Sequence, residues 1–363
     1  MKLRVHRLIE HASLAAALAL CAAAAAALVA FAAPGAKPAT AADPGTARET
    51  PFRVRTFNAR QHGDWIGNGI AYGPHRDGQS PTGKQPTREQ LTEDLKLLAA
   101  RWKLVRIYGA GATAEDIASI IRAEHLPLRL MLGAWVAVTE RRDANGAVVE
   151  SFPAARAANR SELESAVRLA RAYPGIVNAI CGGNETQVSW SDHRVPVDSL
   201  IAAIRWVRAR TSVPVTTADD FNFWNKPESN AVAAEVDFIV MHAHPMWNGK
   251  QIGEALDWTT KTWESIHMAH TGRQVVLGET GWATRVGTEG DQAKLIKGHP
   301  GEPEQATFLR EIVDWCDRTG TVTYFFEAFD ENWKGGSQPA EVEKHWGVFR
   351  ADRSPKLAVA PSH

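Results

Sequence analysis

From about residue 65 onward, short apolar runs alternate with longer segments that have the spacing of amphipathic helices. This alternation is typical of βα units that build a parallel sheet. Eight such runs are present, and eight parallel strands with helices between them close into a (β/α)8 TIM barrel. We expect the strands at residues 69–73, 104–108, 128–132, 176–181, 213–217, 238–241, 275–277 and 322–326.

The segments between these runs carry helix signals. Residues 87–90, Thr-Arg-Glu-Gln, match a capping box, and Leu91, Leu95 and Leu98 follow on one helix face. No second domain and no repeat beyond the βα rhythm is indicated. We therefore predict that residues 61–363 form a single barrel domain.

The first 60 residues differ in composition from the rest. Residues 1–33 combine basic Lys2 and Arg4 with a long Ala/Leu-rich run. This pattern predicts a signal peptide, and a run of this length is also compatible with an N-terminal membrane anchor. Residues 34–60, which begin rich in Ala, Pro and Thr, are predicted to be a flexible linker. We expect an exported protein that is periplasmic, at the cell surface or extracellular.

The charge balance gives no sign of a nucleic-acid or membrane partner, and the cysteines give no sign of a disulfide framework. Lys plus Arg and Asp plus Glu are 41 each, so the formal net charge is zero and nothing indicates a nucleic acid or an anionic membrane surface. Beyond the leader only Cys181 and Cys316 remain, which is too few for a disulfide framework. No Cys/His spacing indicates a zinc site. We predict a monomer without a protein partner.

Two glutamates each follow directly on an apolar strand. Glu185 comes after Gly-Gly-Asn at the end of the fourth run, and Glu279 comes after the seventh. Residues at the C-terminal ends of barrel strands converge on one mouth. A lone glutamate there usually caps a helix or pairs with an arginine, but two at matched ends favour a catalytic pair. Glycoside hydrolysis needs such a pair, with one carboxyl protonated and the other ionised.

Several motifs resemble glycoside hydrolase family 17, the β-1,3-glucanases. The two signatures are Gly-Asn-Glu at residues 183–185 and Glu-Thr-Gly-Trp at residues 279–282. Further likeness at residues 69–73, 105–108, 329–334 and 343–349 extends the resemblance to most of residues 68–355. Residues 72–81 are similar to bacterial members, which include transglycosylases as well as hydrolases.

The resemblance implies a retaining enzyme that acts on a β-glucan oligo- or polysaccharide without a metal or other cofactor. By this match Glu185 is the acid/base and Glu279 the nucleophile. Glu331, Lys334 and Glu343 would form a charged group that supports the site. Water as the second substrate makes the enzyme a hydrolase, and a sugar hydroxyl makes it a β-1,3-glucanosyltransferase. The separation of the two carboxyls, roughly 5–5.5 Å for retention and 6.5–9.5 Å for inversion, is not given by a sequence.

Other residues are predicted to support the site. Asn184 can hold a sugar 2-hydroxyl, and Lys334 near Glu331 and Glu343 would lower the pKa of the nucleophile. A solvated ion pair of little value is the alternative for Lys334. Arg106 lies in the matched second strand and is expected to contact substrate. Aromatic side chains gather near the predicted mouth, with Trp282 and Trp333 the best candidates for stacking on sugars: Tyr72, Tyr108, Trp135, Trp224, Trp247, Trp282 and Trp333.

His242 and His244 end the sixth predicted strand and leave three alternatives open. They bind substrate hydroxyls, they fill space as polar residues, or they bind a metal in a metal-dependent hydrolase. Asp219 and Asp220 end the fifth strand and either bind hydroxyls or cap a helix. A non-catalytic glucan-binding barrel is a further alternative, but it would be expected to have lost a catalytic glutamate, and both are present.

Overall fold

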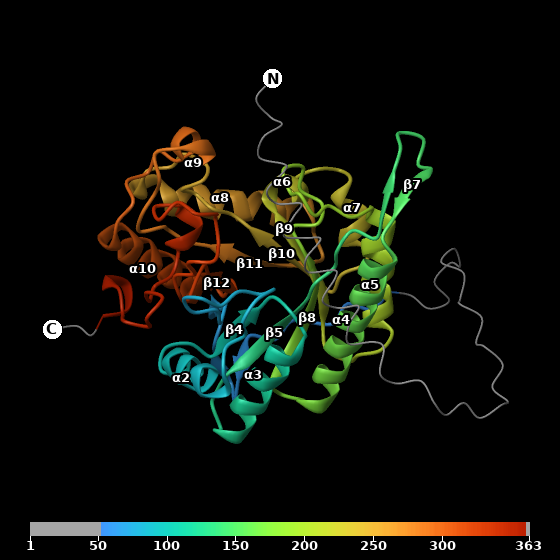
Figure 1. The fold of residues 1–363 in the computed structure, drawn as a ribbon, viewed down its shortest axis with the longest axis horizontal. Helices are drawn as coiled ribbons and strands as arrows, with labels where there is room; N and C mark the ends of the chain where they lie inside the picture. The colour runs from blue at the N-terminus through green and yellow to red at the C-terminus, as the bar shows by residue number, and fades with distance from the viewer. Residues whose placement is uncertain (1–51, 361–363) are drawn as a thin grey trace.

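The computed structural model describes residues 52–360 as a closed barrel surrounded by helices. The eight barrel strands pair in parallel in the order β3-β4-β5-β8-β9-β10-β11-β12, and β12 pairs with β3 (Figure 1). This confirms the predicted (β/α)8 architecture, and each of the eight predicted runs overlaps one barrel strand. The strands are β3 (Asn68–Ala71), β4 (Leu104–Ile107), β5 (Arg129–Ala134), β8 (Val177–Asn184), β9 (Val215–Asp220), β10 (Phe238–His242), β11 (Gln274–Thr280) and β12 (Thr323–Phe325).

The helices follow the strands along the chain. α2 begins at the predicted capping box, where the Thr87 hydroxyl accepts from the backbone of Gln90. The helices are α2 (Arg88–Ala99), α3 (Ala112–Ala123), α4 (Pro153–Ala172), α5 (Val197–Arg208), α6 (Phe221–Trp224), α7 (Ser229–Ala233), α8 (Ile252–Ala269), α9 (Gly290–Leu295) and α10 (Glu302–Thr319), with 3-10 turns η1 (Val342–Lys344) and η2 (Leu357–Val359). None of the helices in residues 52–360 is long and apolar enough to cross a membrane.

Two short hairpins were not predicted. One pairs β1 (Arg60–Gln61) with β2 (Asp64–Trp65), and the other pairs β6 (Glu140–Arg142) with β7 (Val148–Ser151). The second hairpin stands clear of the barrel (Figure 1). Its strands have no buried face, so the chain lacks the apolar alternation that identifies a strand in a sequence.

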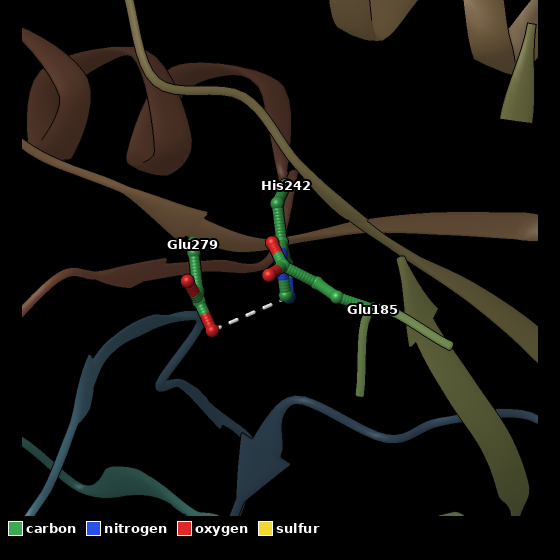
Figure 2. Close-up of side chains that lie close together, drawn as sticks. All are labelled: Glu185, His242 and Glu279. Carbon is green, nitrogen blue, oxygen red and sulfur yellow. Dashed lines mark hydrogen bonds and ion pairs between the residues drawn. The ribbon is translucent and has the colours of Figure 1, made fainter. Parts of the chain in front are cut away.

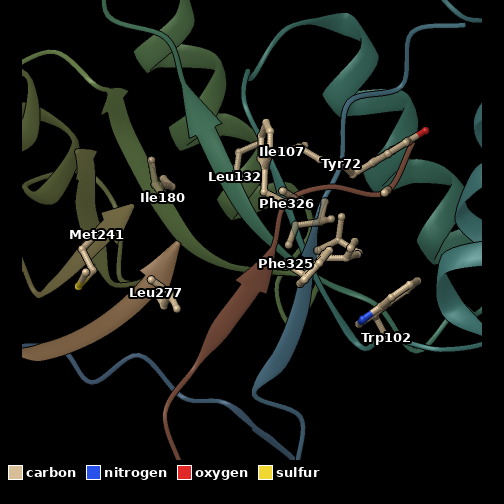
Figure 3. Packing of buried hydrophobic residues seen from close by; sticks show 14 of the residues in the cluster. Tyr72, Trp102, Ile107, Leu132, Ile180, Met241, Leu277, Phe325 and Phe326 are labelled. Atoms are coloured by element: carbon tan, nitrogen blue, oxygen red, sulfur yellow. The ribbon is translucent and has the colours of Figure 1, made fainter. Parts of the chain in front are cut away.

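Alternation along the barrel strands separates two cores. In β10, Phe238 and Val240 face the barrel interior, whereas Ile239 and Met241 face the surrounding helices. Figure 3 shows the outer layer, in which side chains such as Met241 and Leu277 pack between the strands and the helices. The period of two places the next interior position of β10 at His242, at the mouth of the barrel.

The segment before β1 packs against the barrel. Phe57 and Ala59 are buried in the same cluster as the barrel interior, and the Phe57 ring lies 4.8 Å from that of Phe238. The Arg55 amide donates to Asp237 at 2.8 Å. The predicted linker boundary at residue 61 is therefore too late, because residues 55–59 belong to the folded domain. The predicted leader, residues 1–33, lies outside the described residues.

We predict that Phe57→Ala lowers the free energy of unfolding by about 3 kcal/mol, because it leaves a cavity under the barrel core. Urea denaturation followed by circular dichroism measures the change. Val54→Ala is the control, since Val54 is 39% exposed and should change stability by less than about 0.5 kcal/mol. Equal stability of the two variants would show that the segment adds nothing to the barrel.

Candidate active site

Irregularities in two strands turn the predicted glutamates into the barrel mouth. The register between β10 and β11 shifts by one residue at Gly278. Met241 pairs with Leu277, and the next residue, His242, pairs with Glu279. In β8 the register shifts after Cys181, and Glu185 takes a left-handed conformation with φ of 51°. That conformation costs roughly 1 kcal/mol, and the Glu185 amide is held by a 2.8 Å bond to the carbonyl of Ala218.

The two carboxylates meet around a buried histidine (Figure 2). One ligand atom each of Glu185, His242 and Glu279 lies within 4.8 Å of the others. His242 Nδ1 lies 2.9 Å from Glu185 Oε1, and His242 Nε2 lies 3.4 Å from Glu279 Oε1. The pair therefore shares one cleft, as predicted from matched strand ends.

Glu279 is surrounded by donors and a cation. Its Oε1 accepts from Arg106 at 2.6 Å and from the Tyr108 hydroxyl at 2.9 Å, and its Oε2 lies 3.4 Å from His244 Nε2. Burial alone would raise the pKa of Glu279, but His242, Arg106 and His244 together outweigh burial and hold the pKa well below its usual value. Glu279 is thus the ionised member of the pair.

Glu185 has the opposite environment. Burial, followed by the negative charge of Glu279, raises the pKa of Glu185 to about 8. At neutral pH this carboxyl keeps its proton beside an ionised partner. The separation of the two pKa values is what distinguishes a general acid from a nucleophile in a paired-carboxylate site.

Arg106 also fixes Asn184. Its second terminal nitrogen donates to Asn184 Oδ1 at 2.6 Å, so one guanidinium connects β4 with β8 and β11. His193 donates to the Asn184 carbonyl at 2.9 Å and supports the same turn. Arg106 therefore acts behind the site, on the groups beside it, whereas the sequence predicted a substrate contact.

The charged group after β12 differs from the predicted one. Lys334 contacts Glu327 at 2.7 Å and Glu331 at 2.9 Å, whereas the predicted partner Glu343 accepts from Trp247. Burial alone would raise the pKa of Glu331, but Lys334 lowers it to about 2. Burial raises the pKa of Glu327 well above its usual value. The sequence analysis missed Glu327, although it too is a carboxylate that follows a strand.

Two predicted substrate contacts are buried elsewhere. The Tyr72 hydroxyl donates to Asp94 of α2, and Tyr72 is 1% exposed. Trp282 is fully buried, packs against Phe308 of α10 and donates to the carbonyl of His299. Both were expected to face sugar, but each side chain points toward the helix layer instead. Trp224 is likewise a fully buried packing residue.

Other aromatic rings remain accessible. Trp333 and Trp135 are each 41% exposed, and Trp190, which the sequence analysis did not single out, is 57% exposed. A small crevice beside Trp135 is lined by Arg106, Tyr108 and Asn184, among others, and these three residues either contact Glu279 or directly precede Glu185 in the chain. These rings are better placed than Trp282 to stack on a sugar chain.

The two aspartates that end β9 mainly organise the backbone around them. Asp219 accepts from the amides of Gln187 and Val188, in the loop that follows Glu185. Asp220 caps α6 by accepting from the amide of Asn222, which is the helix-capping alternative.

The carboxylates and His242 also have the spacing of a possible metal-ligand set within residues 52–360. His244 is not a member of this set, so it differs from the histidine pair considered in the sequence. The guanidinium of Arg106 lies 2.6 Å from Glu279 and opposes the binding of a second cation there.

Comparison with known proteins identifies the family. Residues 69–347 match the model of the BtgE/BtgC glycoside hydrolase domain. The chain belongs to this family. The glycoside hydrolase domain is 27% identical over 292 residues to a glucan 1,3-beta-glucosidase of Arthroderma benhamiae, covering 76% of this chain and 86% of that protein. It is 25% identical over 292 residues to glucan endo-1,3-beta-glucosidase btgC of Emericella nidulans, covering 76% of this chain and 42% of the relative.

The chain thus spans less than half of the btgC proteins, 40% in Aspergillus niger and 42% in Emericella nidulans. The relatives named here are fungal, and the expected likeness to bacterial members stays a prediction. Among solved structures, an endo-laminarinase from Formosa Hel1_33_131 superposes with a TM-score of 0.69 at 24% identity, covering 81% of this chain and 86% of that one. That similarity confirms the shared barrel fold of the glycoside hydrolase domain.

We predict a bell-shaped pH dependence of kcat/KM for the glycoside hydrolase domain. Activity needs Glu279 ionised and Glu185 protonated. It falls as pH drops through the low pKa of Glu279, and it falls again as pH rises through about 8, the pKa of Glu185. Kinetics across the pH range with an aryl glycoside that has a good leaving group measure both limbs.

Glu185→Gln separates the two limbs. This variant should keep the acid limb and lose the basic limb on the activated substrate, because no proton is needed for departure of the leaving group. A basic limb that persists in Glu185→Gln would assign that titration to another residue.

Proposed function

We propose that this domain is a retaining glycoside hydrolase that acts on β-1,3-glucan. The observation that carries the proposal is the pair of carboxyls within 4.8 Å, one with a raised and one with a lowered pKa. A short separation favours a direct attack by the ionised carboxylate, since inversion needs a wider gap that holds a water. The names of the fungal relatives support β-1,3-glucan as the substrate.

In the first step Glu185 donates its proton to the glycosidic oxygen while Glu279 attacks the anomeric carbon. The leaving sugar departs with that proton, and a covalent glycosyl ester forms on Glu279. In the second step Glu185 removes a proton from water, which displaces Glu279 and releases the sugar with its original configuration. Arg106 stabilises Glu279 as it becomes a carboxylate again.

Substrate positioning follows from the surrounding contacts. Because Asn184 Oδ1 accepts from Arg106, its Nδ2 is left as the donor for a sugar hydroxyl. Tyr108 and His244 hold the two oxygens of Glu279, and Trp135 and Trp333 offer exposed rings for stacking. Export of the chain remains a prediction from residues 1–33.

A glucanosyltransferase is the second candidate, because the same site serves a sugar hydroxyl in place of water. The exposed ring of Trp135 lies 5.0 Å from the ring of His193, which bonds the carbonyl of Asn184 beside the acid/base, and it favours binding of an acceptor sugar there. Incubation with a single laminari-oligosaccharide separates the two candidates. Products that are all shorter than the substrate indicate hydrolysis, and longer products indicate transfer.

Azide rescue tests the assignment of the two glutamates. Glu185→Ala should lose roughly 10²–10⁴-fold in kcat/KM on the glucan, the usual contribution of general acid catalysis. With azide and an activated substrate this variant should give a β-glycosyl azide, because the covalent intermediate still forms. Glu279→Gly should give the α-azide by direct displacement.

Glu164→Gln is the matched control, because Glu164 is exposed on α4 and pairs only with Arg160 among the ion pairs of residues 52–360. It should retain the activity of the unmodified chain. Full activity of Glu185→Ala or Glu279→Gly would contradict the proposed function.

A further inference from the structure

His242 lies between the two carboxylates and is fully buried (Figure 2). Its two ring nitrogens face different partners, with Nδ1 2.9 Å from Glu185 Oε1 and Nε2 3.4 Å from Glu279 Oε1. The proposed reaction does not itself require an imidazole at this position. The contact with Glu185 is a hydrogen bond, whereas Nε2 makes no hydrogen bond with Glu279.

The strand holds the ring in place. His242 follows Phe238 and Val240 on the interior face of β10 and pairs in register with Glu279 on one side and Asp220 on the other. The ring also lies against Gly278, where an added Cβ would approach His242 Cδ2 at 3.4 Å. A ring confined in this way presents Nδ1 to Glu185 in one orientation.

The hydrogen-bond partners assign the proton of the neutral ring. Burial lowers the pKa of His242 to about 3, so the ring carries one N–H. Glu279 Oε1 already accepts from Arg106 and Tyr108, and Nε2 has no hydrogen-bond partner within residues 52–360. With the N–H on Nδ1, the ring donates to Glu185 Oε1, and Nε2, which has no hydrogen-bond partner in this part of the chain, carries no proton.

We propose that His242 is a positioning residue that reserves Oε1 of Glu185 as an acceptor and leaves Oε2 as the oxygen that carries the moving proton. This role rests on the proposed function. In the first step Oε2–H gives its proton to the glycosidic oxygen as that C–O bond breaks. In the second step Oε2 takes a proton from water as the ester bond to Glu279 breaks. The Nδ1–H bond stays in place and no proton passes through the ring.

Two substrates of different leaving-group ability test this role. Loss of His242 should impair protonation of a poor leaving group and spare an activated one. We expect His242→Ala to lower kcat/KM on a β-1,3-glucan oligosaccharide roughly 100-fold, and on a dinitrophenyl glycoside of the same sugar less than about 10-fold. A residue with a merely structural role would affect both substrates alike.

Two conservative variants locate the required donor. Asparagine places an amide N–H close to the position of Nδ1, and glutamine places one close to Nε2. We expect His242→Asn to recover glucan activity to within about 10-fold of the unmodified chain and His242→Gln to remain impaired. Far-UV circular dichroism and thermal unfolding confirm that each variant is folded, and the Asn/Gln pair decides the matter even if His242→Ala does not fold.

His270→Ala is the matched control, because His270 is another buried histidine and contacts Ser229 and Trp224 in place of the carboxylates. It should leave the ratio of the two substrate activities unchanged. Equal losses of His242→Ala on both substrates, or equal recovery by Asn and Gln, would overturn the role of His242. An unmodified chain that is inactive on every β-1,3-glucan would instead contradict the proposed function itself.

Discussion

The buried guanidinium of Arg106 is the contact on which the site depends. It extends from β4 to bond Glu279 on β11 and Asn184 at the end of β8, and it is 1% exposed. A buried ion pair is costly to desolvate and is weak evidence for stability. Its value here is chemical, because the cation favours the ionised form of Glu279, while burial and the charge of Glu279 make Glu185 the member of the pair that holds a proton.

Lys334, a partly buried cation in the loop after β12, pairs with different carboxylates. Lys334 lies between Glu327 and Glu331, so its charge is balanced locally and it does not compete with Arg106 for Glu279. The barrel mouth thus holds two separate charged groups, Arg106 with Glu279 and Lys334 with its two glutamates. Arg106 favours the ionised form of Glu279, and Lys334 anchors the loop after β12 that carries the exposed ring of Trp333.

The sequence predicts the strands and the two glutamates well because both depend on local pattern. Apolar runs mark the strands, and the position directly after a run marks the mouth of a barrel. The face on which a side chain lies depends on register, and a slip of one residue reverses it. Glu279 reaches the interior through a register shift that no local pattern reveals.

Local pattern also cannot show which partner a side chain at the barrel mouth contacts, and this explains the wrong predictions for Tyr72 and for one partner of Lys334. Tyr72 and Tyr108 each lie near the end of a predicted strand, yet Tyr108 bonds Glu279 while Tyr72 bonds Asp94 of α2. The partner of Lys334 depends on how the loop after β12 folds back, so Glu343 was chosen where Glu327 makes the contact. The partners of these side chains are set by contacts between residues far apart in the chain, and the pattern of a single sequence does not reveal such contacts.

Trapping of the covalent intermediate tests the central claim most directly. A 2-deoxy-2-fluoro β-glycoside with an activated leaving group should form the ester on the nucleophile and break down slowly, because the fluorine destabilises the oxocarbenium-like transition state. Peptide mass spectrometry should then find one glycosyl group, attached to Glu279. A label on a different carboxylate, or turnover of the natural glucan by a chain that never forms the ester, would contradict the assignment of the two glutamates.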